Sequence, residues 1–116
     1  MIYYYRSLIS EQEKRKKRFN TLKSSLNGSV VPALSKIYDN LINASKYINN
    51  GLVIDGDSGD GESIMNNATC ISDLKSKITG SVLNEINSEI TKCDSNISYY
   101  YRKIKEIQEE QESGGW

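Results

Sequence analysis

Residues 71–107 read ISDLKSKITGSVLNEINSEITKCDSNISYYYRKIKEI, and this stretch decides the fold. Apolar residues recur every three or four positions in it and just before it: Ile64, Ala68, Ile71, Leu74, Ile78, Val82, Ile86, Ile90, Cys93, Ile97, Tyr100, Ile104 and Ile107. Such spacings place side chains on one face of an α-helix. The stretch predicts one long amphipathic helix over about residues 63–112, capped by Asp60 or Ser63 and made irregular only at Gly80.

The first half of the chain carries a weaker version of the same pattern, from Ile2 to Ile48. Asn27-Gly28-Ser29 interrupts it, and Pro32 suits the first turn of a restarted helix. We therefore expect two helical pieces, over about residues 3–26 and 31–49, with the first arm broken near Gly28-Pro32.

Between the two patterns lies a turn-rich acidic segment, residues 50–62. The predicted fold is all-α, a long antiparallel helical hairpin in one domain of residues 1–112, followed by a flexible tail, 113–116. Arm one covers about 3–49 and arm two about 63–112. A turn centred near residue 56 would place Tyr3 to Tyr5 beside Ile107 and Glu109, residues 14–18 beside 94–98, and Gly80 opposite Pro32.

Composition argues against several classes of function. The chain has no His, which removes the commonest general base and metal ligand, and no nucleophile with an activating base can be assembled. We expect no enzyme, no cofactor and no metal site. Net charge is zero, so the basic block Lys14-Arg15-Lys16-Lys17-Arg18 favours a solvated helix face or contact with an acidic groove of a partner over a nucleic-acid footprint. No apolar run is long enough to span a membrane, and the N-terminus does not read as a signal peptide.

Two local features have simple structural interpretations. The tip Asp55-Gly56-Asp57-Ser58-Gly59-Asp60 resembles the start of a calcium loop, but Asp60 stands where that loop needs glycine and Asn66 where it needs a bidentate Glu. We expect a solvated turn there. Cys70 and Cys93 lie too far apart on one helix to bond, and we expect both to be small apolar residues of the seam.

Apolar surface left over by the hairpin points to protein partners. Two helices bury one narrow stripe each, so a third helix or a second copy is needed to cover the rest. Each tyrosine triplet, 3–5 and 99–101, must turn at least one ring away from the seam, because neighbouring helical residues are about 100° apart. The predicted partner-binding residues are Tyr4, Tyr5, Leu8, Ile71, Leu74, Ile78, Val82, Ile86, Ile90, Ile97, Tyr100 and Tyr101.

Three segments resemble the YwqH-like helical proteins, partners of LXG-domain toxins in Gram-positive type VII secretion. They are Tyr3-Tyr4-Tyr5 with Leu8-Ile9-Ser10, the loop Gly51-Leu52-Val53-Ile54-Asp55-Gly56, and the helix Ile71-Ser72-Asp73-Leu74-Lys75 with residues 83–90. The resemblance covers nearly the whole chain and implies a WXG-like hairpin. The chain has no Trp-x-Gly turn and no aromatic residue followed four positions later by Asp or Glu, so any export signal would be shared with another chain.

The resemblance implies a non-enzymatic targeting partner that binds the LXG domain of a toxin together with a second small helical protein and promotes its export. We expect a cytoplasmic protein, and export with the toxin through the type VII system if it leaves the cell. A self-associating coiled-coil homodimer is the first alternative, and a hairpin that binds nucleic acid through residues 14–18 is the second.

Overall fold

The computed structural model describes residues 1–48 and 58–114, and these residues form helices only. In chain order the elements are α1 (Ile2–Ser25), the π-helical turn η1 (Leu26–Val30), α2 (Val31–Tyr47), α3 (Ser58–Lys77), the π-helical turn η4 (Ile78–Val82) and α4 (Leu83–Gly114). The predicted all-α helical hairpin is therefore confirmed. The calcium-like residues 55–57 and most of the predicted acidic turn lie outside the described residues.

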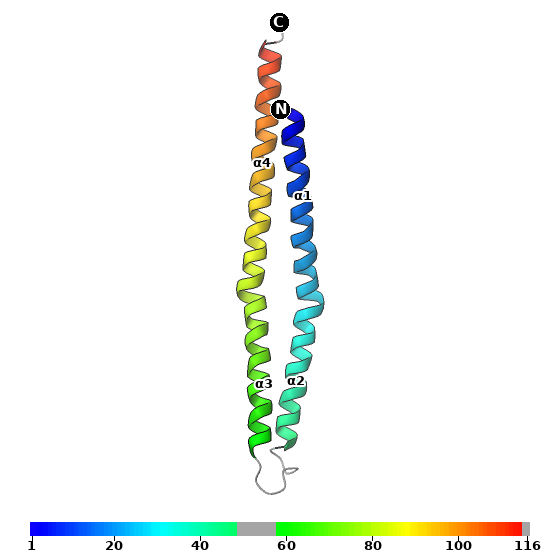
Figure 1. Ribbon diagram of the computed structural model, residues 1–116, viewed down its shortest axis with the longest axis vertical. Helices are drawn as coiled ribbons and strands as arrows, with labels where there is room; N and C mark the ends of the chain where they lie inside the picture. The colour runs from blue at the N-terminus through cyan, green and yellow to red at the C-terminus, as the bar shows by residue number, and fades with distance from the viewer. Residues whose placement is uncertain (49–57, 115–116) are drawn as a thin grey trace. The chain divides into compact units, whose positions relative to one another are not determined.

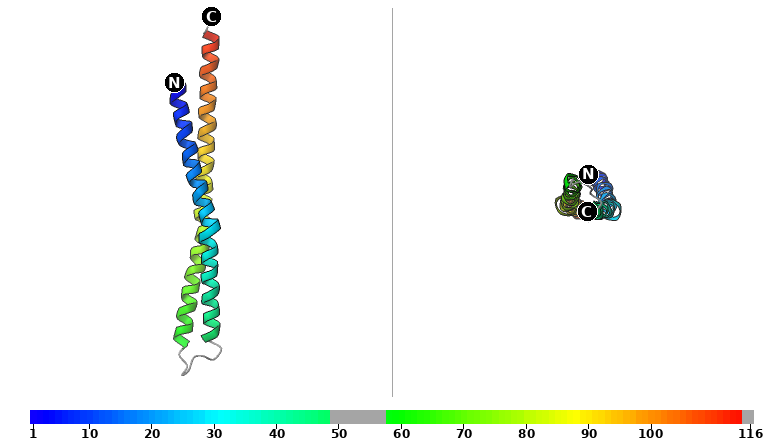
Figure 2. Two further views of the ribbon diagram at one scale, coloured as in Figure 1. Left: turned by 90° about the vertical axis from the view of Figure 1, so that its right-hand side faces the viewer. Right: turned by 90° about the horizontal axis from the view of Figure 1, so that it is seen from below.

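The chain divides into two compact units, which we call the first unit (Met1–Lys23 with Asn84–Trp116) and the second unit (Ser24–Leu83). In the first unit α1 runs antiparallel to α4, and in the second unit α2 runs antiparallel to α3 (Figure 1). The turned view of Figure 2 also shows α2 and α3 side by side. Each unit thus has its own two-helix seam.

The seam of the first unit is built from branched aliphatic residues and one cysteine. Ile9 of α1 is buried, as are Ile86, Cys93 and Ile104 of α4. The α4 residues are seven and eleven positions apart, spacings that return to nearly the same helix face. One face of α4 accordingly covers α1, and the rest of its circumference stays open to solvent.

The seam of the second unit includes small residues in the last turn of α2, in the first turn of α3 and halfway along α3. Ser45 is 2% exposed and Ala68 is 0% exposed, while Gly61 is also buried. Leu34 and Ile78 fill the part of this seam farther from those helix ends. Small side chains let two helix backbones approach closely, so this seam leaves little space for a larger residue.

Two π-helical turns of nearly the same sequence, Leu26-Asn27-Gly28-Ser29-Val30 and Ile78-Thr79-Gly80-Ser81-Val82, stand in the second unit. After each turn a backbone N–H donates to the carbonyl five residues earlier, Val31 to Leu26 and Leu83 to Ile78. The two turns lie at the same level of their arms (Figure 1). The structure therefore shows no clear break near Gly28-Pro32, because the chain stays helical through one wider turn.

The glycines of these turns do not serve close packing. A Cβ added to Gly28 or Gly80 would meet no heavy atom within 4 Å, and neither residue has a positive φ.

Two helix ends differ from the sequence prediction. α3 begins at Ser58, so Asp60 and Ser63 lie inside the helix instead of capping a start near residue 63. α4 continues to Gly114, past the expected end near residue 112. Helix ends are the least determined part of a periodic pattern, because polar residues such as Ser and Asp fit both a cap and a first turn.

Replacing Gly28 or Gly80 with Ala should stabilise the protein by about 0.5–1 kcal/mol each, because Ala loses less backbone entropy on folding and its Cβ enters open space. Urea denaturation followed by circular dichroism measures the change. A lower stability for either variant would mean that the π turn itself requires glycine.

Replacing Ala68 with Leu should destabilise the protein by roughly 1–3 kcal/mol, because the larger side chain must force the α2–α3 seam apart. The matched control is Asn67→Leu at the exposed neighbouring position, which should change the unfolding free energy by less than about 0.5 kcal/mol. Equal effects of the two substitutions would contradict the tight seam.

Candidate partner-binding surface

Polar and aromatic contacts fix which residues of α1 and α4 face each other in the first unit. Lys16 Nζ lies 2.7 Å from Asp94 Oδ1, which confirms the predicted position of the basic block. The ring centroids of Tyr5 and Tyr100 are 6.0 Å apart, whereas the sequence placed Tyr5 beside Ile107. That prediction was wrong because α3 begins at Ser58, which moves the centre of the turn toward the N-terminus.

Glu89 lies at the centre of a small charge network. Its Oε1 accepts from Lys92 Nζ at 3.0 Å, and its Oε2 accepts from Arg15 Nη2 at 3.3 Å. The hydrogen bond from Lys92, followed by the charges of Lys92 and Arg15, holds the pKa of Glu89 below its ordinary value. Glu89 thus pairs with two cations, so the three side chains together carry one excess positive charge.

Tyrosine rings form a connected cluster across the first unit. Tyr4 and Tyr5 meet at 5.4 Å, Tyr5 and Tyr100 at 6.0 Å, and Tyr99 and Tyr100 at 5.7 Å between ring centroids. Cations from Arg102 and Lys103 lie 5.5 Å from the Tyr99 centroid. Exposed rings include Tyr3, Tyr4, Tyr99 and Tyr101, so each triplet does turn rings away from the seam, as predicted. Exposed tyrosine rings of this kind are favoured at protein interfaces.

The predicted partner-binding residues occupy three kinds of environment. Ile78 and Ile86 are buried inside the chain, and substitutions there would test folding more than binding. Tyr5, Leu8, Ile71, Ile90, Ile97 and Tyr100 are half-buried beside the seams. The exposed members are Tyr4, Leu74, Val82 and Tyr101.

The two sides of the second unit differ in polarity. Between α2 and α3, one side has a polar groove lined by Ser35, Tyr38, Asp39, Ser72 and Lys75. Ile37 and Leu74 each precede a groove residue, Tyr38 and Lys75, by one position, a rotation of about 100°. Because the helices are antiparallel, this rotation carries both side chains across the seam to the opposite side.

That opposite side is apolar and open. Ile37 is 44% exposed and Leu74 is 46% exposed. Val30, 38% exposed, lies seven residues before Ile37, and Val82, 37% exposed, lies eight residues after Leu74. Seven residues return an α-helix to within about 20° of the same line. The eighth residue between Leu74 and Val82 is taken up by the wider π-helical turn η4. We call these four residues the apolar face of the second unit.

Sequence reasoning missed part of this surface. None of the predicted partner-binding residues is among a further set of exposed apolar and aromatic residues, Leu22, Val30, Ile37, Tyr47 and Met65. The seven-residue spacing of Val30, Ile37 and Ala44 is the signal that could have separated a flanking line from the seam at Leu34.

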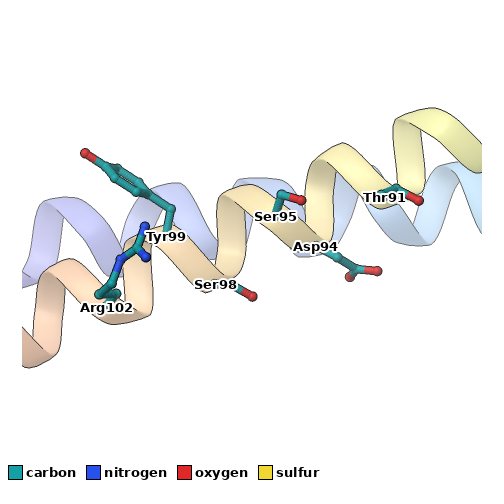
Figure 3. Close-up of a pocket in the computed structure, with 6 residues that line it drawn as sticks. All are labelled: Thr91, Asp94, Ser95, Ser98, Tyr99 and Arg102. Carbon is teal, nitrogen blue, oxygen red and sulfur yellow. The ribbon is translucent and has the colours of Figure 1, made fainter.

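The first unit also has a shallow hollow on α4. Figure 3 shows a shallow hollow whose lining side chains, Thr91, Asp94, Ser95, Ser98, Tyr99 and Arg102, all come from α4. Within residues 1–48 and 58–114 no three His, Cys, Asp or Glu side chains gather as a metal site. Nor is any helix of that described part long and apolar enough to cross a membrane.

The structure confirms part of the predictions for the two cysteines and the basic block. Cys93 is buried in the seam as expected, but Cys70 is exposed, so its assignment to the seam was wrong. In the basic block, Arg15 and Lys16 pair with Glu89 and Asp94 in the first unit. These pairs leave only part of the block for a polyanion.

None of the family models, curated proteins or solved structures compared with this chain matches it. The choice of candidate partner-binding residues therefore rests on the geometry of the chain itself.

Replacing Glu89 with Gln should lower the urea midpoint at neutral pH, and the gap to the parent protein should close as pH falls below about 4. The sign follows from the lowered pKa of Glu89: the carboxylate stabilises the fold above its unfolded pKa and loses this effect as it is protonated. Lys16 and Lys103 have raised pKa values, so their contributions are lost only at alkaline pH.

The control for this titration is Glu85→Gln, since Glu85 is exposed and makes no ion pair with any residue of the described part of α4 or α1. A gap for Glu89→Gln that stays constant from neutral to acidic pH would contradict a role for its charge.

Proposed function

We propose that this chain is a non-enzymatic helical partner protein that binds a helix of another protein along the apolar face of its second unit. In line with its resemblance to YwqH-like proteins, the partner is the LXG domain of a type VII-secreted toxin, bound together with a second small helical protein. The chain promotes export of the toxin by completing a helical bundle.

The observation that carries this proposal is the contrast between the two sides of the second unit. Ile37 and Leu74 leave nearly half of their surface exposed on one side, while Ser35, Asp39 and Ser72 line the other. A helix pair with one apolar side is a suitable receiver for a third amphipathic helix, which contributes its own apolar stripe. The exposed tyrosines of the first unit add residues that protein interfaces favour.

The experiment is co-expression of the tagged chain with the LXG domain encoded by a neighbouring gene, followed by affinity capture. The double variant Ile37→Asp with Leu74→Asp should reduce the captured LXG domain by at least about tenfold, because two carboxylates would be desolvated in the interface. Both positions are open to solvent in the free chain, so circular dichroism should show an unchanged helical fold.

The matched control is Asn43→Asp with Ser76→Asp, which adds the same charge at exposed positions off the apolar face and should leave capture intact. Undiminished capture by the Ile37 and Leu74 double variant would contradict the proposal. A stable homodimer that ignores the LXG domain would favour the self-associating coiled coil in its place.

A further inference from the structure

A second unoccupied line of side chains runs along α1 in the first unit. Leu8, Arg15 and Leu22 are each seven residues apart, so they lie on one line of the helix, about 10 Å between successive members. Leu8 is half-buried, Leu22 is exposed, and the Arg15 side chain is 55% exposed. The line therefore alternates apolar, cationic and apolar.

Contacts across the seam show on which side of the first unit this line runs. Arg15 reaches Glu89, and Gln12 accepts from Asn96 Nδ2 at 3.4 Å, so the side that carries Arg15 also carries these two α4 residues. Lys16 reaches Asp94, and its side chain points 100° away from that of Arg15. The line thus flanks the seam and does not form it.

Arg15 is held in place but not saturated. Its guanidinium lies 5.6 Å from the centroid of the Phe19 ring, and within residues 1–48 and 58–114 its side-chain hydrogen bond goes to Glu89 alone. A guanidinium has five N–H donors in a planar fork, so most of them remain for another acceptor. The ion-paired side chains Arg15, Glu89 and Lys92 together carry a net charge of +1, which favours an incoming carboxylate.

We propose that Leu8, Arg15 and Leu22 dock an amphipathic helix of another protein that carries Asp or Glu at its centre and apolar residues seven positions before and after it. The ion pair between Arg15 and the partner's central Asp or Glu sets the register of the two helices, as a single polar residue does at the interface of a coiled coil. Since seven-residue spacing is the same in both directions, the pattern fits a parallel or an antiparallel helix. The inference rests on the proposed function, to which it adds the chemistry of a further partner helix that binds the first unit.

A second copy of this chain does not fit the same line. No Asp or Glu in the sequence has apolar residues seven positions away on both sides. Glu85, for example, has Ile78 on one side but Lys92 on the other. The occupant is accordingly a different protein whose helix supplies the acidic centre.

The test uses two synthetic helical peptides of about 22 residues, roughly 33 Å long, that are identical except for a central Glu or Lys. Both carry Leu seven positions before and after the centre. Fluorescence anisotropy of the labelled peptides with the full chain should show the Glu peptide binding at least about tenfold more tightly than the Lys peptide.

Variants of the chain assign this preference to Arg15. Arg15→Gln should remove the preference for the Glu peptide, and Arg15→Glu should reverse it. Lys14→Glu makes the same charge change as Arg15→Glu on the neighbouring residue and should keep the preference. Leu22→Asp should lower the affinity for both peptides by about the same factor. The Arg15→Gln variant avoids placing two carboxylates together, so it gives an answer even if Arg15→Glu fails to fold.

Equal affinity for both peptides, no binding of either, or a preference that survives Arg15→Gln would overturn the inference. So would a homodimer of the chain that excludes both peptides. These failures differ from failure of the proposed function. If the peptides show no preference that depends on Arg15, but the double variant Ile37→Asp with Leu74→Asp still abolishes capture of the LXG domain, only the inference about Arg15 is rejected.

Discussion

Burial of one narrow apolar stripe from each of two antiparallel helices is the interaction on which the rest of this protein depends. In the first unit the buried residues are Ile9 on α1 and Ile86, Cys93 and Ile104 on α4, and in the second unit they include the small residues Ser45 and Ala68. A helix pair has no third element to cover its flanks. The same geometry that holds each unit together therefore leaves Ile37, Leu74 and Leu22 in contact with water.

Polar contacts decide register in the first unit more than they add stability. Exposed ion pairs such as Lys16 with Asp94 contribute little free energy, because water screens them and two long side chains must be ordered. They do, however, disfavour other alignments of α1 against α4, since a shifted helix would bring Arg15 and Lys16 to different partners. Tyr5 against Tyr100 adds an aromatic contact that is specific to this alignment.

The two open lines of side chains differ in chemistry, which bears on the kind of partner each would bind. The apolar face of the second unit has no charged residue among Val30, Ile37, Leu74 and Val82, so its affinity for a partner would come from the burial of apolar surface. The line of Leu8, Arg15 and Leu22 carries a charge at its centre, and it would discriminate between helices. A partner that used both would obtain affinity from one unit and selectivity from the other.

The sequence by itself determined the helical content and the antiparallel arms, because the apolar residues from Ile64 to Ile107 return every three or four positions and a glycine-rich acidic segment precedes them. It also placed Cys93 and Ile86 in the seam. Only the tertiary structure decided that Tyr5 meets Tyr100, that Cys70 is exposed and that Ile37 lies beside the seam. Periodicity identifies a helix face about 100° wide, and the facing helix selects which part of that face is buried.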